Sequence, residues 1–238
     1  MRVLVPFGYY VGNDVIDPRE YDFTDLRNEE NISLNSIQRD SYPDSTYVND
    51  LQNLPPAEYV EKYTRILAKD KHHRLRDIIE AKFNMMMYSL LGNHDYKFKI
   101  TTSWITRLNK GDEIQAHRHH NCYYSGVLYF GEDYTDAANL TLRNPIATNS
   151  YIHFSTAQDN GNMMHGDFTI NAYTGGLYFW PSQFEHSTGV SRVNNRSSLA
   201  FNLVPTQAIY SADSSLSVDW LSPAKSHNLI NDTNDYPT

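Results

Sequence analysis

The feature that most constrains the fold is a series of short segments between residues 96 and 205 in which apolar and polar residues alternate. Alternation at every second position is typical of a β-strand with one buried face. The first expected strand, Lys97–Leu108, would place Phe98, Ile100, Thr102 and Trp104 on one face. Further strands are expected at Glu113–His119, Tyr123–Phe130, Asn139–Leu142, Tyr151–Phe154, Asp167–Asn171, Gly176–Trp180, Phe184–Thr188 and Arg196–Val204. Short strands at nearly regular spacing predict a sandwich or barrel, not a parallel α/β sheet.

Two helices are expected before these strands. One begins near Pro55 and carries an apolar stripe that ends at Ile66 and Leu67, and the second runs roughly from Arg74 to Leu91. Residues 1–54 lack periodicity, and residues 206–238 lose the strand pattern. The sequence therefore predicts three parts: an irregular N-terminal segment with two helices (1–95), a β domain (96–205) and a polar C-terminal tail (206–238).

Composition limits the classes of function. The formal net charge is −8, which argues against generic binding to nucleic acid phosphates. A single cysteine, Cys122, excludes an internal disulfide. No stretch approaches the length of a transmembrane helix, and no secretory signal pattern is present, so we expect a cytoplasmic protein without a membrane partner.

Three histidines and an arginine suggest chemistry. On a strand, His117 and His119 would share one face and could bind one ion together, with His186 arriving from a distant strand. Such a set leaves metal positions open, as in non-haem Fe(II) sites, which usually have two histidines and one carboxylate. Arg196 and Ser198 would also share a face, and a guanidinium can hold a carboxylate through two hydrogen bonds. The pattern predicts an oxygenase with a dicarboxylate cosubstrate.

Three blocks of sequence carry a family resemblance: SWITRLNKGDEIQAHRHHNCYYSGVLYF, LRNP and GGLYFWPSQFEHSTGVSRVNNRSSLAFN. Over roughly residues 98–204 they resemble the Fe(II)- and 2-oxoglutarate-dependent oxygenases, and among these a family found in phages and bacteria. The resemblance implies a mainly β, double-stranded β-helix (a cupin-like jelly roll) with the N-terminal helices packed on it.

The same resemblance implies roles for single residues. His117 and His186 would bind Fe(II), Arg196 and Ser198 would hold the far carboxylate of 2-oxoglutarate, and Tyr129 would hydrogen-bond the same cosubstrate. The chain departs from the larger superfamily at His119, where an Asp or Glu is usual. With His119 as the third ligand, the site would be one unit more positive, which favours anion binding.

Three functions remain open on the sequence. The first is a 2-oxoglutarate-dependent dioxygenase that hydroxylates an unidentified small molecule or protein. The second is a non-catalytic phage virion protein with an oxygenase-like jelly roll, which the exchange at His119 favours and which would have virion or homo-oligomeric neighbours. The third is a thiol-dioxygenase-like site with three histidines, which would not need Arg196.

Overall fold

The computed structural model describes residues 10–29, 62–91, 96–120, 122–143, 145, 167–206, 209–211 and 214–216. The N-terminal elements are β1 (Gly12–Val15), α1 (Thr24–Arg27), the 3-10 helices η3 (Ile66–Ala68) and η4 (Asp70–His72), and α4 (His73–Leu91). The strands that follow are β2 (Phe98–Leu108), β3 (Tyr124–Tyr129), β4 (Leu140–Leu142), β5 (Phe168–Ile170), β6 (Gly176–Pro181), β7 (His186–Thr188), β8 (Arg196–Pro205), β9 (Ile209–Ser211) and β10 (Ser214–Leu216).

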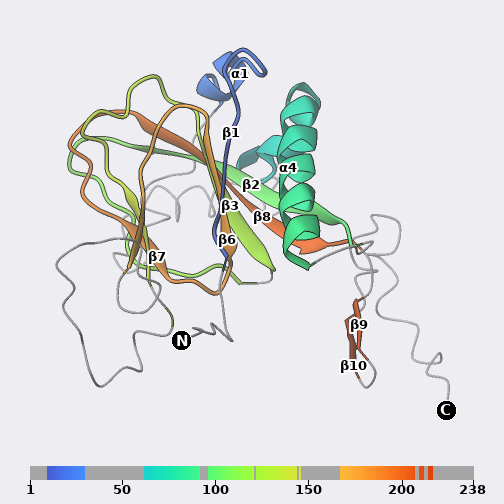
Figure 1. The fold of residues 1–238 in the computed structure, drawn as a ribbon. Helices are drawn as coiled ribbons and strands as arrows, with labels where there is room; N and C mark the ends of the chain where they lie inside the picture. The colour runs from blue at the N-terminus through green and yellow to red at the C-terminus, as the bar shows by residue number, and fades with distance from the viewer. Residues whose placement is uncertain are drawn as a thin grey trace, which may run out of the picture.

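Two antiparallel sheets form the body of the protein. The larger has the strand order β1-β6-β3-β8-β2, and the smaller has the order β5-β4-β7. Helix α4 covers the face of the large sheet that is turned away from the small sheet (Figure 1). In the large sheet no two neighbouring strands follow one another in the chain, as in a jelly roll, and this confirms the predicted mainly β fold with helix packed on it.

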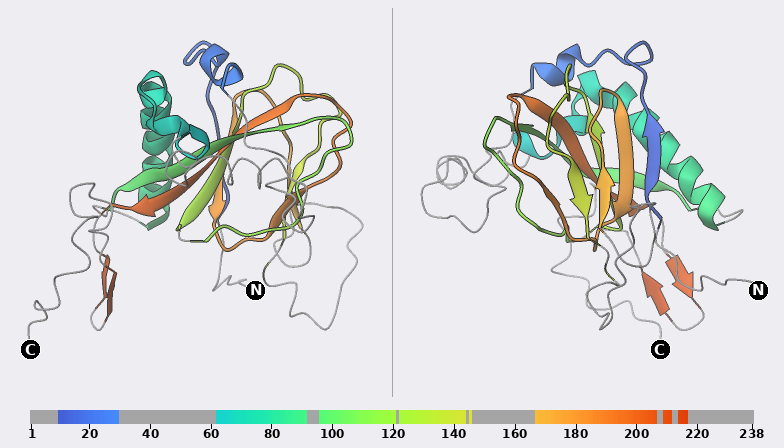
Figure 2. Two further views of the ribbon diagram at one scale, coloured as in Figure 1. Left: turned by 180° about the vertical axis from the view of Figure 1, so that it is seen from behind. Right: turned by 60° about the vertical axis from the view of Figure 1, so that its left-hand side comes forward.

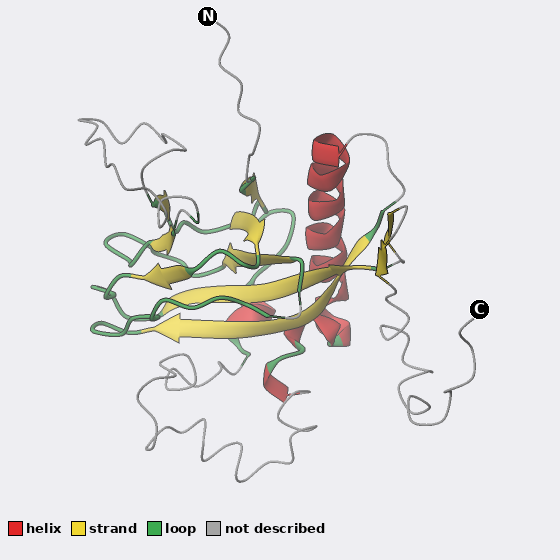
Figure 3. Ribbon diagram, turned by 90° about the horizontal axis from the view of Figure 1, so that it is seen from below, coloured by secondary structure: helices red, strands yellow, loops and turns green. Residues whose placement is uncertain are grey.

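The alternation in β8 divides its side chains between two environments. Leu199, Phe201 and Leu203 are fully buried in the core beneath α4. Arg196, Ser198 and Asn202 point to the opposite side, where they line a cavity between the sheets. Figure 3 shows β2 and β8 side by side, with α4 standing on one side of the sheet.

A β-bulge changes the alternation predicted for β2. The register with β8 shifts between Ile100 and Thr102, so Thr101 is an extra residue. Phe98 therefore faces α4, where its ring lies 5.2 Å from that of Phe83, whereas Thr102 and Trp104 line the cavity. The expectation that Phe98, Ile100, Thr102 and Trp104 share one face was wrong, because a bulge cannot be read from period-two spacing.

Helix α4 begins and ends close to where its sequence pattern predicts. Leu75, Ile79, Phe83 and Met87 are buried at intervals of four residues and form its stripe against the sheet.

The helix predicted to begin near Pro55 differs from expectation. Its start lies outside the described residues, and near residue 65 the backbone pairs with Ser103 on the edge of β2 instead of continuing a helix.

Residues 10–29, where no element was predicted, add β1 to one edge of the large sheet and α1 near the other edge. The predicted strand Tyr151–Phe154 lies outside the described residues. The predicted strand Glu113–His119 was wrong: this segment is irregular, and only His117 makes an isolated bridge, to His186. In the region expected to be a polar tail, β9 and β10 pair as a small sheet separate from the two main sheets (Figure 2). No helix among the described residues is long and apolar enough to cross a membrane.

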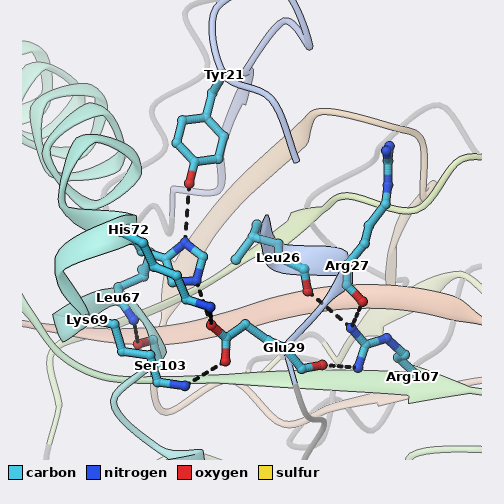
Figure 4. Close-up of polar contacts among 10 residues, drawn as sticks. Tyr21, Leu26, Arg27, Glu29, Leu67, Lys69, His72, Ser103 and Arg107 are labelled. Carbon is cyan, nitrogen blue, oxygen red and sulfur yellow. Dashed lines mark hydrogen bonds and ion pairs between the residues drawn. The ribbon is translucent and has the colours of Figure 1, made fainter. Parts of the chain in front are cut away.

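A buried carboxylate ties residues 10–29 to the 3-10 helices that precede α4, and Arg107 ties the same segment to the large sheet (Figure 4). Glu29 accepts hydrogen bonds from Lys69 Nζ at 2.6 Å and from His72 Nε2 at 3.0 Å, and it also pairs with Lys71. Arg107 of β2 donates to the main-chain carbonyls of Leu26, Arg27 and Glu29. Burial alone would raise the pKa of Glu29, but the hydrogen bonds from its cationic neighbours prevail and lower that pKa to about 2.

We expect Glu29→Gln to lower the free energy of unfolding by about 2 kcal/mol at neutral pH, because the amide forms weaker hydrogen bonds with Lys69 and His72. Folding lowers the pKa of Glu29 from 4.5 to about 2, so its contribution is present above pH 4.5 and is lost as the pH falls toward 2. Stability of the native protein should therefore decline more steeply from about pH 5 to about pH 3 than that of the variant, as urea denaturation would measure. Asp77→Asn, which changes an exposed carboxylate, is the control, and equal slopes for native protein and Glu29→Gln would contradict the assignment.

Candidate metal centre and cosubstrate pocket

The three predicted histidines converge. His186 opens β7, and its backbone pairs with that of His117 through two hydrogen bonds, of 2.9 and 3.0 Å. His119 is placed by a separate bond from its backbone N–H to the carbonyl of Ser182. The ligand atoms of the three side chains all lie within 4.8 Å of one another. The segment that carries His117 and His119 is not the regular strand that was predicted, so individual backbone contacts bring the two rings together.

Hydrogen bonds determine which nitrogen of two of these rings can bind a metal. Nδ1 of His117 lies 2.8 Å from the carbonyl of Gln115, and Nδ1 of His186 lies 2.9 Å from the carbonyl of Phe184. A carbonyl only accepts, so each Nδ1 carries the hydrogen and each Nε2 presents a lone pair. Burial, followed by the nearby His117 and His119, lowers the pKa of His186 well below its usual value, which keeps this ring neutral.

The donor set fits one transition-metal ion. Nε2 of His117 and Nε2 of His119 are 3.3 Å apart. Two nitrogens bound to one ion at about 2.1 Å and at nearly a right angle would be separated by about 3 Å. Imidazole nitrogens suit Fe(II), as well as zinc, copper and nickel. The residues present can therefore hold Fe(II) through three neutral ligands.

Among the described residues, Arg196 has the largest fully buried side chain. Its Nε donates to the carbonyl of Ala138 at 2.5 Å, and its Nη2 donates to the hydroxyl of Tyr129 at 3.2 Å. Ser198 lies directly opposite Tyr129 in the register of β8 and β3. Burial raises the pKa of Tyr129, and this hydroxyl stays protonated although Arg196 acts in the other direction. The structure thus brings together the three residues that were expected to hold the cosubstrate.

The histidines and Arg196 line one cavity of about 390 Å³. Its described lining includes Trp104, Trp180 and a second arginine, Arg118, but no aspartate or glutamate. The ring of Trp180 lies 5.2 Å from that of His186. Within the described part of the chain, Trp180 Nε1 is the buried side-chain donor without an acceptor. The cavity is thus rich in hydrogen-bond donors and positive charge, which favours an anionic ligand.

Sequence reasoning missed several lining residues, among them Asn202 and Thr102, whose side chains are hydrogen-bonded to each other. Asn202 could have been found, since it lies an even number of residues after Arg196 and so shares the strand face of Ser198. Thr102 was expected only to share a strand face with Phe98, and the bulge separates the two.

Residues 102–202 match the model of a protein family described as "Putative 2OG-Fe(II) oxygenase". The matched region contains all six residues predicted for the site. This match agrees with the resemblance found in the sequence, and the family so described implies Fe(II) and 2-oxoglutarate as cofactors. It gives no support for a phage origin or for a virion protein.

Solved structures of oxygenases resemble the chain at low identity. A 2OG-Fe(II) oxygenase family oxidoreductase from Burkholderia pseudomallei is 15% identical, with a TM-score of 0.41, and 56% of this chain covers 56% of that protein. A truncated viral collagen prolyl hydroxylase from Paramecium Bursaria Chlorella virus-1 is 10% identical, with a TM-score of 0.44, and 85% of this chain covers 95% of it. No curated protein sequence matches the chain. Similarities this low carry no information on the substrate.

We expect the metal-free protein to bind Co(II), a stable probe for the site, and to lose that binding in His186→Asn. Removing one of three ligands should weaken the affinity by more than the roughly 10–100-fold that follows from loss of a residue that only supports a ligand. Calorimetric titration would measure the dissociation constant. His73→Asn, at a half-exposed histidine on α4, should bind Co(II) like the native protein. Unchanged affinity in His186→Asn would rule out this centre.

Proposed function

We propose that the protein is an Fe(II)- and 2-oxoglutarate-dependent dioxygenase that hydroxylates a substrate carbon. The observation that supports this most directly is the buried guanidinium of Arg196, which makes no ion pair with an acidic side chain among the described residues and lies in the same cavity as the three histidines. A buried cation needs an anionic partner to offset the loss of its hydration. The far carboxylate of 2-oxoglutarate is such a partner.

The polar residues around Arg196 would each contribute to binding the far carboxylate of 2-oxoglutarate. The guanidinium would hold the carboxylate, and its bonds to Ala138 and Tyr129 fix the plane in which the carboxylate must lie. The protonated hydroxyl of Tyr129 accepts from Arg196 and can donate its own hydrogen to the carboxylate. Ser198, opposite Tyr129, offers a further hydroxyl.

The other end of 2-oxoglutarate would reach the metal. His117, His119 and His186 would hold Fe(II) through neutral nitrogens and leave coordination positions open for ligands. Bound Fe(II) would supply oxygen activation, which couples decarboxylation of 2-oxoglutarate to succinate and CO2 with insertion of one oxygen atom into a C–H bond. Because the protein ligands carry no charge, the two carboxylates of the cosubstrate would balance much of the positive charge of the cavity.

The substrate would bind in the same cavity, beside Fe(II) and 2-oxoglutarate. Trp104 and Ile114 provide apolar surface in the cavity, and Thr64, Thr102 and Thr106 add hydroxyl groups. The volume lies within the range of small-molecule sites, about 300–1,000 Å³. These residues identify no particular substrate.

We expect Arg196→Ala to weaken the binding of 2-oxoglutarate about 100-fold while leaving Co(II) affinity unchanged, because the variant removes the carboxylate partner and none of the metal ligands. Calorimetry on Co(II)-loaded protein gives the affinity, and succinate formation by the Fe(II) form reports turnover. Arg143→Ala, which changes an exposed arginine paired with Glu185, should behave like the native protein.

Arg196→Ala also separates two of the functions left open by the sequence. A thiol-dioxygenase-like centre with three histidines would not use Arg196, so it predicts the same activity with and without the guanidinium. Native affinity for 2-oxoglutarate in this variant, or no succinate from the native protein across a broad substrate panel, would overturn the proposed function.

A further inference from the structure

To bind a metal, His119 must present the correct ring nitrogen, a condition that a carboxylate ligand at the same position would not have to meet. A carboxylate can bind a metal through either oxygen, whereas a neutral imidazole binds only through the nitrogen that lacks a hydrogen. For His117 and His186 a main-chain carbonyl fixes that choice. For His119 the neighbours are side chains: Nδ1 lies 2.7 Å from Oδ1 of Asn202 and 2.9 Å from Oγ of Ser125, whose hydrogen goes to Asn202.

The amide of Asn202 is itself held in one orientation. Its Nδ2 donates to the hydroxyl of Thr102 at 3.0 Å, and its Oδ1 accepts from the hydroxyl of Ser125 at 3.0 Å. Asn202 pairs directly with Thr102 on β2 and with Ser125 on β3, so the three side chains form a row on one face of the sheet. Ser125 is fully buried, which limits competition from water for these bonds.

We propose that Asn202 is a positioning residue that fixes His119 in the tautomer able to bind the metal. With Oδ1 toward the ring, Nδ1 must carry the hydrogen, and Nε2 turns its lone pair toward His117 and His186. With the amide reversed, Nδ1 would accept from the amide and Nε2 would carry the hydrogen, so the ring could not act as a ligand. The inference rests on the three-histidine metal site of the proposed function.

The hydrogen bonds among Asn202, Thr102 and Ser125 are also compatible with a histidine, in place of a carboxylate, at position 119. Asn202 is neutral, so it orients the ring without adding a negative charge to a cavity whose described lining has no acidic side chain. Hydrogen bonds of this kind, which orient a ligand from behind, commonly change metal affinity by about 10–100-fold when they are removed.

The test compares Asn202→Leu, which has a similar size but no acceptor, with Asn202→Asp, which keeps one. Nitrogen NMR of the histidine rings in the metal-free protein reports the tautomer directly. We expect His119 to carry its hydrogen on Nδ1 in the native protein and in Asn202→Asp, and to become a mixture in Asn202→Leu. Co(II) affinity should fall about 10–100-fold in Asn202→Leu and be largely retained in Asn202→Asp. Asn171→Leu, at an exposed asparagine outside the cavity lining, is the control.

Native tautomer and native Co(II) affinity in Asn202→Leu would overturn the proposal, as would a hydrogen on Nε2 of His119 in the unaltered protein. If Asn202→Leu does not fold, Asn202→Ala removes the same acceptor, and the measurement on the native protein still decides the tautomer. Neither readout requires turnover. A failure of 2-oxoglutarate chemistry alone would therefore overturn the proposed function and leave the role of Asn202 standing.

Discussion

The arrangement of this protein depends on the position of β8 between β3 and β2. Because β8 is hydrogen-bonded on both sides, the direction of each of its side chains is fixed. A slip by one residue would move Arg196 into the apolar core and Leu199 into the cavity, so the burial of Leu199, Phe201 and Leu203 under α4 opposes it. The energy that packs the helix on the sheet thus also holds the guanidinium in its buried place.

The candidate metal centre differs from the Arg196 region, because its residues are held by both sheets. His186 belongs to the small sheet, and His117 is tied to it by paired backbone hydrogen bonds. His119 is oriented from the large sheet, through Asn202. A bound ion would therefore link the two layers, and its geometry would depend on how they are spaced.

The charges in the cavity suit a ligand that contacts both the histidine cluster and Arg196. The described cavity lining contains the buried Arg196, Arg118 and four histidines, and no acidic side chain is among them. Burial keeps His186 neutral and Tyr129 protonated, so the groups that meet a ligand are lone pairs for a cation and donors for an anion. Such a cavity suits a dianion that bridges a metal and a guanidinium.

The sequence by itself determined most strands of the two main sheets, because alternation shows which residues can share a face. It also determined the candidate histidines, Arg196 and Ser198, because their residue types have specific chemistry. It could not determine the bulge in β2, the pairing of β1 with β6 or the irregular backbone at His117, since each depends on hydrogen bonds to residues distant in the chain. The role of Asn202 belongs to the same group. Only the tertiary structure decided it, because its partners Thr102, Ser125 and His119 come from three other segments that meet when the sheet forms.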